Sequence, residues 1–109
     1  MLGLLIVGLS VISAIYLIYF ISNGGGVDLQ AGRKFAESNC SRCHAIGPTG
    51  ASPLDPAVPF RTFAERWPLE TLEEALAEGI FTGHPAMPEF ELTPQQIRNF
   101  IGYLKTIQQ

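Results

Sequence analysis

The first 21 residues carry no charged side chain, and only Gly3, Gly8, Ser10 and Ser13 interrupt their apolar run. As a helix this run would rise about 32 Å, close to the roughly 30 Å of the hydrocarbon core of a bilayer. A removed signal peptide is the alternative, but such peptides usually have a basic start and a shorter apolar run. We therefore expect residues 1–21 to form an uncleaved transmembrane anchor.

A glycine-rich segment, residues 22–27, follows the apolar run and is expected to act as a flexible tether. The remaining domain, residues 28–109, is near the size at which a protein core alone is only marginally stable. A disulfide, a metal or a cofactor is therefore expected to complete it. Two cysteines exclude a disulfide-dense scaffold, and a net charge of −3 argues against nucleic-acid binding through a basic face.

Helix signals and proline-rich loops alternate along the domain. All eight prolines lie between residues 48 and 94, which indicates loops at 45–59 and 80–92. No run alternates apolar and polar residues over the length of a strand, so the predicted fold class is all-α. The expected helical segments are 29–43, a short turn at 60–66, 71–78, and a final helix after Thr93. Asp28 is the expected N-cap of the first segment. A capping box at Thr71 is expected to start the third segment, and Gly79 to end it.

The final helix has the clearest pattern. Thr93-Pro94-Gln95-Gln96 combines an N-cap threonine, a proline at the first helical position and a glutamine at the third. Apolar residues then recur at i, i+3, i+4 and i+7. They place one apolar face on this helix, formed by Ile97, Phe100, Ile101 and Leu104.

The segment Cys40-Ser41-Arg42-Cys43-His44 has the spacing C-x-x-C-H, which is the attachment sequence for c-type haem. Two cysteines three residues apart at a helix end can reach the two vinyl groups on one side of a porphyrin and form thioethers. The histidine directly after the second cysteine then lies under the ring and can ligate the iron. The motif predicts one covalent haem c on Cys40 and Cys43, with His44 as an axial ligand.

Three other uses of the two cysteines fit the sequence less well. A thiol redox pair favours a βαβ context and does not require the adjacent histidine. A disulfide would close a small loop with little gain in free energy. A zinc site would have enough ligands, but two neighbouring residues cannot easily share one tetrahedron. The residues of that zinc site would be Cys40, Cys43, His44 and His84.

The chain offers two candidates for the second axial ligand of the iron. Met87 is the only methionine besides Met1, and Pro85 and Pro88 stiffen the loop that carries it. A lone methionine is more often a core residue. Beside a haem motif, 43 residues after its histidine, we favour thioether ligation. His84 is the rival, and a second histidine would give a lower potential because thioether ligation raises it.

With this motif, methionine loop and final helix, residues 28–107 resemble the class I c-type cytochromes, specifically small membrane-anchored bacterial ones. The resemblance implies about four short helices around the haem, and Met87-Pro88 matches the family's axial Met-Pro step. It also implies that Gly32 lies where the first and last helices of the domain cross closely. The residues expected to pack at that crossing are Phe35, Ala36, Phe100, Tyr103 and Leu104.

The resemblance further implies a backbone acceptor for the proximal histidine. Pro53, nine residues after His44, stands where the family has the proline whose carbonyl accepts the histidine N–H. That bond fixes the imidazole tautomer and tunes the iron. The family's usual Gly-Pro reads Ser52-Pro53 here, and Pro48 is the alternative acceptor.

Two side chains are candidates at the haem edge. Trp67 could donate its indole N–H to a propionate, although a partly buried packing residue is its simpler interpretation. Arg61 could neutralise a propionate, and an arginine solvated at the surface is the equal alternative.

The resemblance implies a membrane-tethered one-electron carrier, cycling between Fe(III) and Fe(II), with no enzymatic activity of its own. Its expected partners are membrane lipid and membrane redox complexes, such as a cytochrome bc-type donor and an oxidase or photosynthetic acceptor. The domain is expected on the periplasmic side of a bacterial inner membrane, where haem attachment occurs. A permanent haem c subunit of a respiratory or photosynthetic complex is one alternative, and a haem-based sensor, with Met87 off the iron, is another.

Overall fold

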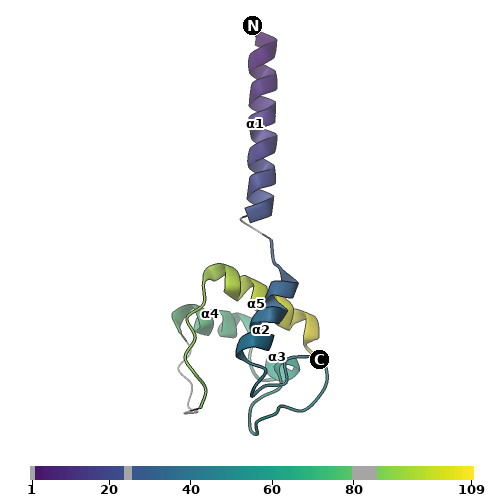
Figure 1. Cartoon of the computed structure of the whole chain (residues 1–109), viewed down its shortest axis with the longest axis vertical. Helices are drawn as coiled ribbons and strands as arrows, with labels where there is room; N and C mark the ends of the chain where they lie inside the picture. Colours follow the sequence, from purple (N-terminus) through teal and green to yellow (C-terminus); the bar gives the residue numbers. More distant parts are fainter. Residues whose placement is uncertain (1, 24–25, 80–85) are drawn as a thin grey trace.

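The computed structural model describes residues 2–23, 26–79 and 86–109, and Figure 1 shows a helical domain from which the N-terminal helix projects. No strand occurs among the described residues, which confirms the all-α class. The helices in chain order are α1 (Leu2–Asn23), α2 (Leu29–Asn39), the 3-10 helix η1 (Phe60–Thr62), α3 (Phe63–Arg66), α4 (Leu69–Glu78) and α5 (Pro94–Ile107).

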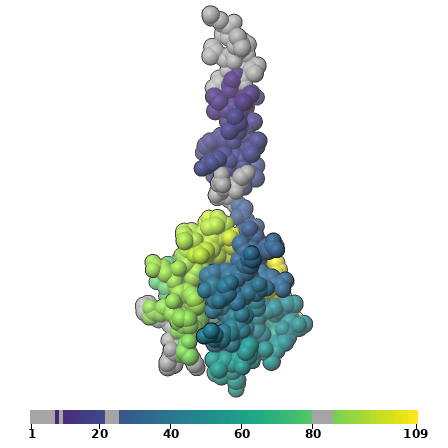
Figure 2. Space-filling model, viewed as in Figure 1, coloured from purple at the N-terminus to yellow at the C-terminus, as the bar shows by residue number. Residues whose placement is uncertain are grey.

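The apolar N-terminal run forms α1, one helix that extends two residues beyond Ile21. Its large apolar side chains from Val11 to Ile21 are each more than half exposed, and in Figure 2 this part of α1 stands out from the domain. Among the described residues, no helix is long and apolar enough to cross a membrane. The anchoring role of residues 1–21 stays a prediction.

The end of the expected tether is attached to the domain. The side-chain amide of Gln95 donates to the carbonyl of Gly26 at 3.1 Å. The backbone N–H of Asp28 donates to Oδ1 of Asn99 at 2.9 Å. The donor Gln95 and the acceptor Asn99 both belong to α5, so the chain enters the domain beside that helix. Gly24 and Gly25 lie outside the described residues.

Helix α2 begins as predicted but ends early. The Asp28 side chain accepts the N–H of Ala31 at 2.9 Å, as an N-cap does. The predicted helix through Cys43 is wrong, because the regular hydrogen-bond ladder stops at Ala36. Its carbonyl accepts the N–H groups of both Cys40 and Ser41, at 2.9 and 3.1 Å. Residues 40–44 then form a tight turn.

The short turn predicted at 60–66 is confirmed as η1 and α3. Helix α4 starts two residues before Thr71, with Pro68 as N-cap and no side-chain cap hydrogen bond. The predicted capping box at Thr71 is therefore wrong, and the earlier start places Leu69 in the core, where it is 7% exposed. The predicted end is correct, since α4 finishes at Glu78 and Gly79 follows with a φ of 92°.

Helix α5 has the predicted capping box and the predicted buried face. The Thr93 hydroxyl accepts the N–H of Gln96 at 3.2 Å, and the Gln96 side chain accepts the N–H of Thr93 at 2.9 Å. The fixed first turn sets which face of the helix meets the core. That face is buried and consists of Ile97, Phe100, Ile101, Tyr103, Leu104 and Ile107.

Helices α2 and α5 cross at Gly32, as the resemblance predicted. A Cβ on this residue would overlap the backbone carbonyl of Asn99. One turn further along α2, the ring of Phe35 packs edge-to-face on Phe100, with centroids 5.4 Å apart. Ala36 and Leu104 are fully buried beside this contact. The crossing thus forms the main core of the domain and holds the end of α2 in place.

Candidate functional site

A cavity of about 270 Å³ opens beside the end of α2. This volume is close to the lower end of the roughly 300–1,000 Å³ that small-molecule and cofactor sites usually have. The walls come from α2, η1, α3, α4, α5 and the loops between them. They are mainly apolar and include Phe35, Phe60, Leu72, Leu76, Phe90 and Phe100.

Cys40 and Cys43 both lie on the wall of this cavity, and neither forms a disulfide. Cys40 caps the end of α2, and Cys43 follows in the tight turn. Burial raises the pKa of the Cys40 thiol to about 11. A thiol that stays protonated at neutral pH is a poor nucleophile. This environment is therefore unlike that of a C-x-x-C redox pair, whose reactive cysteine has a lowered pKa.

No three His, Cys, Asp or Glu side chains within the described ranges converge as they would around a metal ion. His84, the fourth residue of the zinc site considered above and the rival axial ligand, lies outside those ranges.

His44 lines the same cavity and has one defined ring partner. Its Nδ1 lies 2.7 Å from the carbonyl oxygen of Val58. Because a carbonyl can only accept, Nδ1 carries the proton and Nε2 keeps its lone pair. The ring of Phe60 packs against the imidazole, with centroids 4.9 Å apart. His44 is thus held in the tautomer that can ligate iron through Nε2.

The prediction that Pro53 provides the carbonyl for His44 is wrong, since Val58 provides it. Pro53 is exposed, and the carbonyl of the alternative, Pro48, accepts from the side chain of Gln109 at 3.0 Å. The loop after His44 folds back further along the chain than the resemblance implied. A backbone carbonyl has no side-chain signature, and the one local signal is Pro59, which favours an extended Val58 before it.

Met87 comes from the loop before α5 and is partly buried on the wall of the cavity. Its neighbours Ala86 and Pro88 line the cavity as well. The two predicted axial ligands thus come from loops on either side of α4 and share one cavity with both cysteines. Their role at the iron stays a prediction.

The structure places neither Trp67 nor Arg61 on the cavity wall. Trp67 is 50% exposed and packs its ring against Phe63, with centroids 6.3 Å apart. This contact agrees with its simpler interpretation as a packing residue. The Nη1 of Arg61 donates to the carbonyl of Gly50 at 2.6 Å, so this guanidinium holds the loop after the haem motif.

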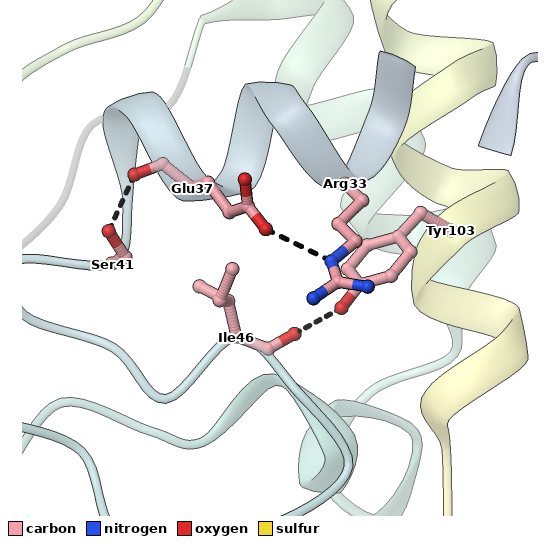
Figure 3. A network of polar contacts seen from close by, with 5 residues as sticks. All are labelled: Arg33, Glu37, Ser41, Ile46 and Tyr103. Carbon is pink, nitrogen blue, oxygen red and sulfur yellow. Dashed lines mark hydrogen bonds and ion pairs between the residues drawn. The ribbon is translucent and has the colours of Figure 1, made fainter. Parts of the chain in front are cut away.

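A further set of polar contacts, which the sequence did not indicate, joins α5 to that loop. The hydroxyl of Tyr103 donates to the carbonyl of Ile46 at 2.7 Å (Figure 3). In the same figure, Arg33 and Glu37 of α2 form an exposed ion pair at 3.0 Å. Tyr103 therefore connects the core crossing to the chain two residues beyond His44.

The residues present fit a covalently attached haem c. The two cysteines and the histidine of the motif, with a thioether donor from another loop, line one cavity with apolar walls. The histidine has the tautomer that iron ligation needs. Bound there, the haem would supply a reversible one-electron couple at its iron.

Comparison with known proteins agrees with this chemistry. A family model described as cytochrome c oxidase, cbb3-type, subunit III matches residues 27–104, well over half of the chain. Searches among curated proteins and among solved structures gave no match. The matched range includes the C-x-x-C-H motif, the Met87 loop and most of α5. The chain belongs to this family: it is a c-type cytochrome of the class I kind, an electron carrier with one covalently bound haem c.

Proposed function

We propose that this cytochrome is a membrane-tethered one-electron carrier between respiratory redox complexes, on the periplasmic side of a bacterial inner membrane. The observation that carries the proposal is that the four residues expected at the haem line one apolar cavity. In this proposal Cys40 and Cys43 hold the haem through thioethers, and His44 and Met87 ligate its iron.

The protein's contribution to electron transfer is to hold its ligands still. The Val58 carbonyl fixes the His44 ring by one hydrogen bond, and the Phe60 ring packs against the same imidazole. With His44 and Met87 both bound to the iron of a haem held here, its ligands would not need to change when an electron arrives or leaves. The apolar walls would keep water from a bound haem, which would favour a higher reduction potential. No position remains at the iron for a substrate, so we infer no enzymatic activity.

The tethering part of the proposal is supported by the uncharged sequence of residues 1–21 and by the exposed apolar side chains of α1. A tether replaces diffusion in bulk by a search near membrane-bound partners and raises the effective concentration without new contacts. The hydrogen bonds that join Gly26 and Asp28 to α5 fix the end of this tether on the domain.

A permanent place in a respiratory complex is the second candidate function. The observation that favours it is the description of the matched family, which names a subunit of a cbb3-type oxidase. Gentle detergent extraction separates the two candidates. A carrier leaves the oxidase during purification, whereas a subunit stays with it in a fixed ratio.

Tethering is tested with the full-length chain, expressed with haem attachment in a bacterium. We expect the haem to stay in the membrane fraction after alkaline carbonate washing, and mass spectrometry to show residues 1–26 together with one haem. Charges in the middle of α1, in the double variant Val11→Arg and Ile12→Arg, should remove haem from the membrane fraction, because each arginine costs about 3 kcal/mol at a bilayer centre. The control is Thr49→Arg in an exposed loop. Haem in the soluble fraction of the unchanged protein contradicts tethering.

The side of the membrane is tested with a reporter fused after Gln109. Activity of a reporter that works only in the periplasm is the expected result. Activity of a cytoplasmic reporter contradicts the proposed location.

A further inference from the structure

The segment 45–60 forms a loop whose two ends meet beside His44. The N–H of Phe60 donates to the carbonyl of Ala45 at 2.9 Å. Val58 lies two residues before Phe60, and its carbonyl accepts the proton on Nδ1 of His44 at 2.7 Å. The carbonyl that accepts the His44 proton therefore belongs to this loop. Its position relative to the imidazole depends on the hydrogen bonds between the loop and the residues next to His44.

Both neighbours of His44 are bonded across this loop. The carbonyl of Cys43 accepts the N–H of Leu54 at 3.2 Å. The N–H of Ala45 donates to the hydroxyl oxygen of Ser52 at 3.0 Å. Together with the bond between Phe60 and Ala45, these contacts hold the chain on either side of the histidine. Of the three, the contact to Ser52 is the one made by a side chain.

Ala45 is buried, at 9% exposure, so its N–H depends on this hydroxyl. A buried backbone N–H that loses its partner carries a desolvation penalty comparable to a lost hydrogen bond or larger. Removing the Ser52 hydroxyl would therefore make the chain at Ala45 shift towards water. Such a shift moves His44, the preceding residue, relative to the Val58 carbonyl.

The other contacts of the loop are further from the histidine and lead elsewhere. Tyr103 binds the carbonyl of Ile46, Arg61 that of Gly50 and Gln109 that of Pro48. These bonds join the loop to α5, to η1 and to the end of the chain. They stabilise its fold, whereas Ser52 acts on the residue next to the ligand.

We propose that Ser52 is a positioning residue for the haem: its hydroxyl holds Ala45 so that Nδ1 of His44 meets the Val58 carbonyl. The proposal rests on the proposed role of His44 as an iron ligand. Hydrogen bonding at Nδ1 makes the other ring nitrogen more basic, and a more basic ligand favours Fe(III). Loss of the hydroxyl should therefore weaken the Nδ1 bond and raise the midpoint potential.

The experiment uses the full-length, haem-loaded protein and four variants. Ser52→Ala removes the hydroxyl. Ser52→Thr and Ser52→Val form a pair of equal shape that differ by the hydroxyl, and Ser38→Ala is a control on the exposed face of α2. In the ferrous protein, exchange of the Nδ1 proton of His44 is followed by NMR, and the midpoint potential is measured by titration.

We expect Ser52→Ala and Ser52→Val to accelerate exchange of the Nδ1 proton roughly tenfold and to raise the potential. Ser52→Thr and Ser38→Ala should match the unchanged protein in both measurements. If Ser52→Ala does not accumulate, the shape-matched threonine and valine variants make the same comparison. A global loss of stability without a change in exchange or potential would show a merely structural serine.

The failures are distinguishable. Unchanged exchange and potential in hydroxyl-free variants whose spectrum still shows histidine ligation overturn the role of Ser52 alone. Equal shifts in the threonine and valine variants overturn it as well, since the hydroxyl then has no part. A spectrum of the unchanged protein without histidine ligation overturns both this inference and the proposed function.

Discussion

Gly32 of α2 lies so close to the backbone carbonyl of Asn99 in α5 that a Cβ at position 32 would overlap that carbonyl. The same crossing brings the ring of Phe35 onto that of Phe100. Both rings also line the haem cavity. The distance between the two helices therefore sets the position of one cavity wall, and with it the end of α2, where Cys40 begins the haem motif.

Gly32→Ala is expected to destabilise the domain by about 3 kcal/mol, because the added methyl group has backbone rather than a flexible side chain in its way. Gly47→Ala is the matched control: nothing lies within 4 Å of a Cβ built there. Denaturant unfolding of the haem-loaded variants gives both free energies. Equal free energies of unfolding for Gly32→Ala and Gly47→Ala would show that the helix crossing has space for a methyl group at position 32.

Thr93→Ala should lower the free energy of unfolding by about 1 kcal/mol, because it removes the hydroxyl that caps α5. Thr71→Ala tests the other sequence with a capping-box pattern. Thr71 lies within α4, so we expect its substitution to be neutral or slightly stabilising, since alanine has the higher helix propensity. A larger loss at Thr71 than at Thr93 would contradict the helix starts described above.

Local signals predicted the elements whose hydrogen bonds close within a few residues. The capping box of Thr93 and the N-cap of Asp28 are of this kind, and the i, i+3, i+4, i+7 pattern identified the buried face of α5. The two cysteines of the haem motif and the favoured axial ligands, His44 and Met87, were recognisable from residue type and spacing. The structure brings these four residues to one cavity.

The features that the sequence did not predict depend on distant or competing partners. The end of α2 is set by two N–H groups that share the Ala36 carbonyl, a choice no propensity scale contains. The start of α4 follows the burial of Leu69 rather than the cap at Thr71. The acceptor of His44 is a backbone carbonyl 14 residues away, which any residue type could provide.

The stability of the domain should fall at alkaline pH through Tyr103. Burial raises the pKa of this phenol above its usual value near 10; the charge of Arg33 lowers the pKa and that of Glu37 raises it. A group whose pKa is raised on folding stabilises the fold fully below its unfolded pKa. That contribution is lost as the pH rises through the folded pKa.

Tyr103→Phe should reduce this alkaline loss, measured as the free energy of unfolding between neutral pH and pH 11. At neutral pH the variant should be less stable by about 1 kcal/mol, because the bond to the Ile46 carbonyl is gone. If the unchanged protein and Tyr103→Phe lose the same free energy of unfolding at alkaline pH, a group other than Tyr103 causes the loss.

Ligation of the iron by Met87 is the central claim, and the absorption spectrum of the oxidised, haem-loaded protein tests it most directly. We predict the charge-transfer band from methionine sulfur to Fe(III) in the unchanged protein. Met87→Leu, which keeps the volume, and Met87→Ala should both lose the band and show a lower midpoint potential. A band that persists in Met87→Leu, or one that the unchanged protein lacks, would contradict this account.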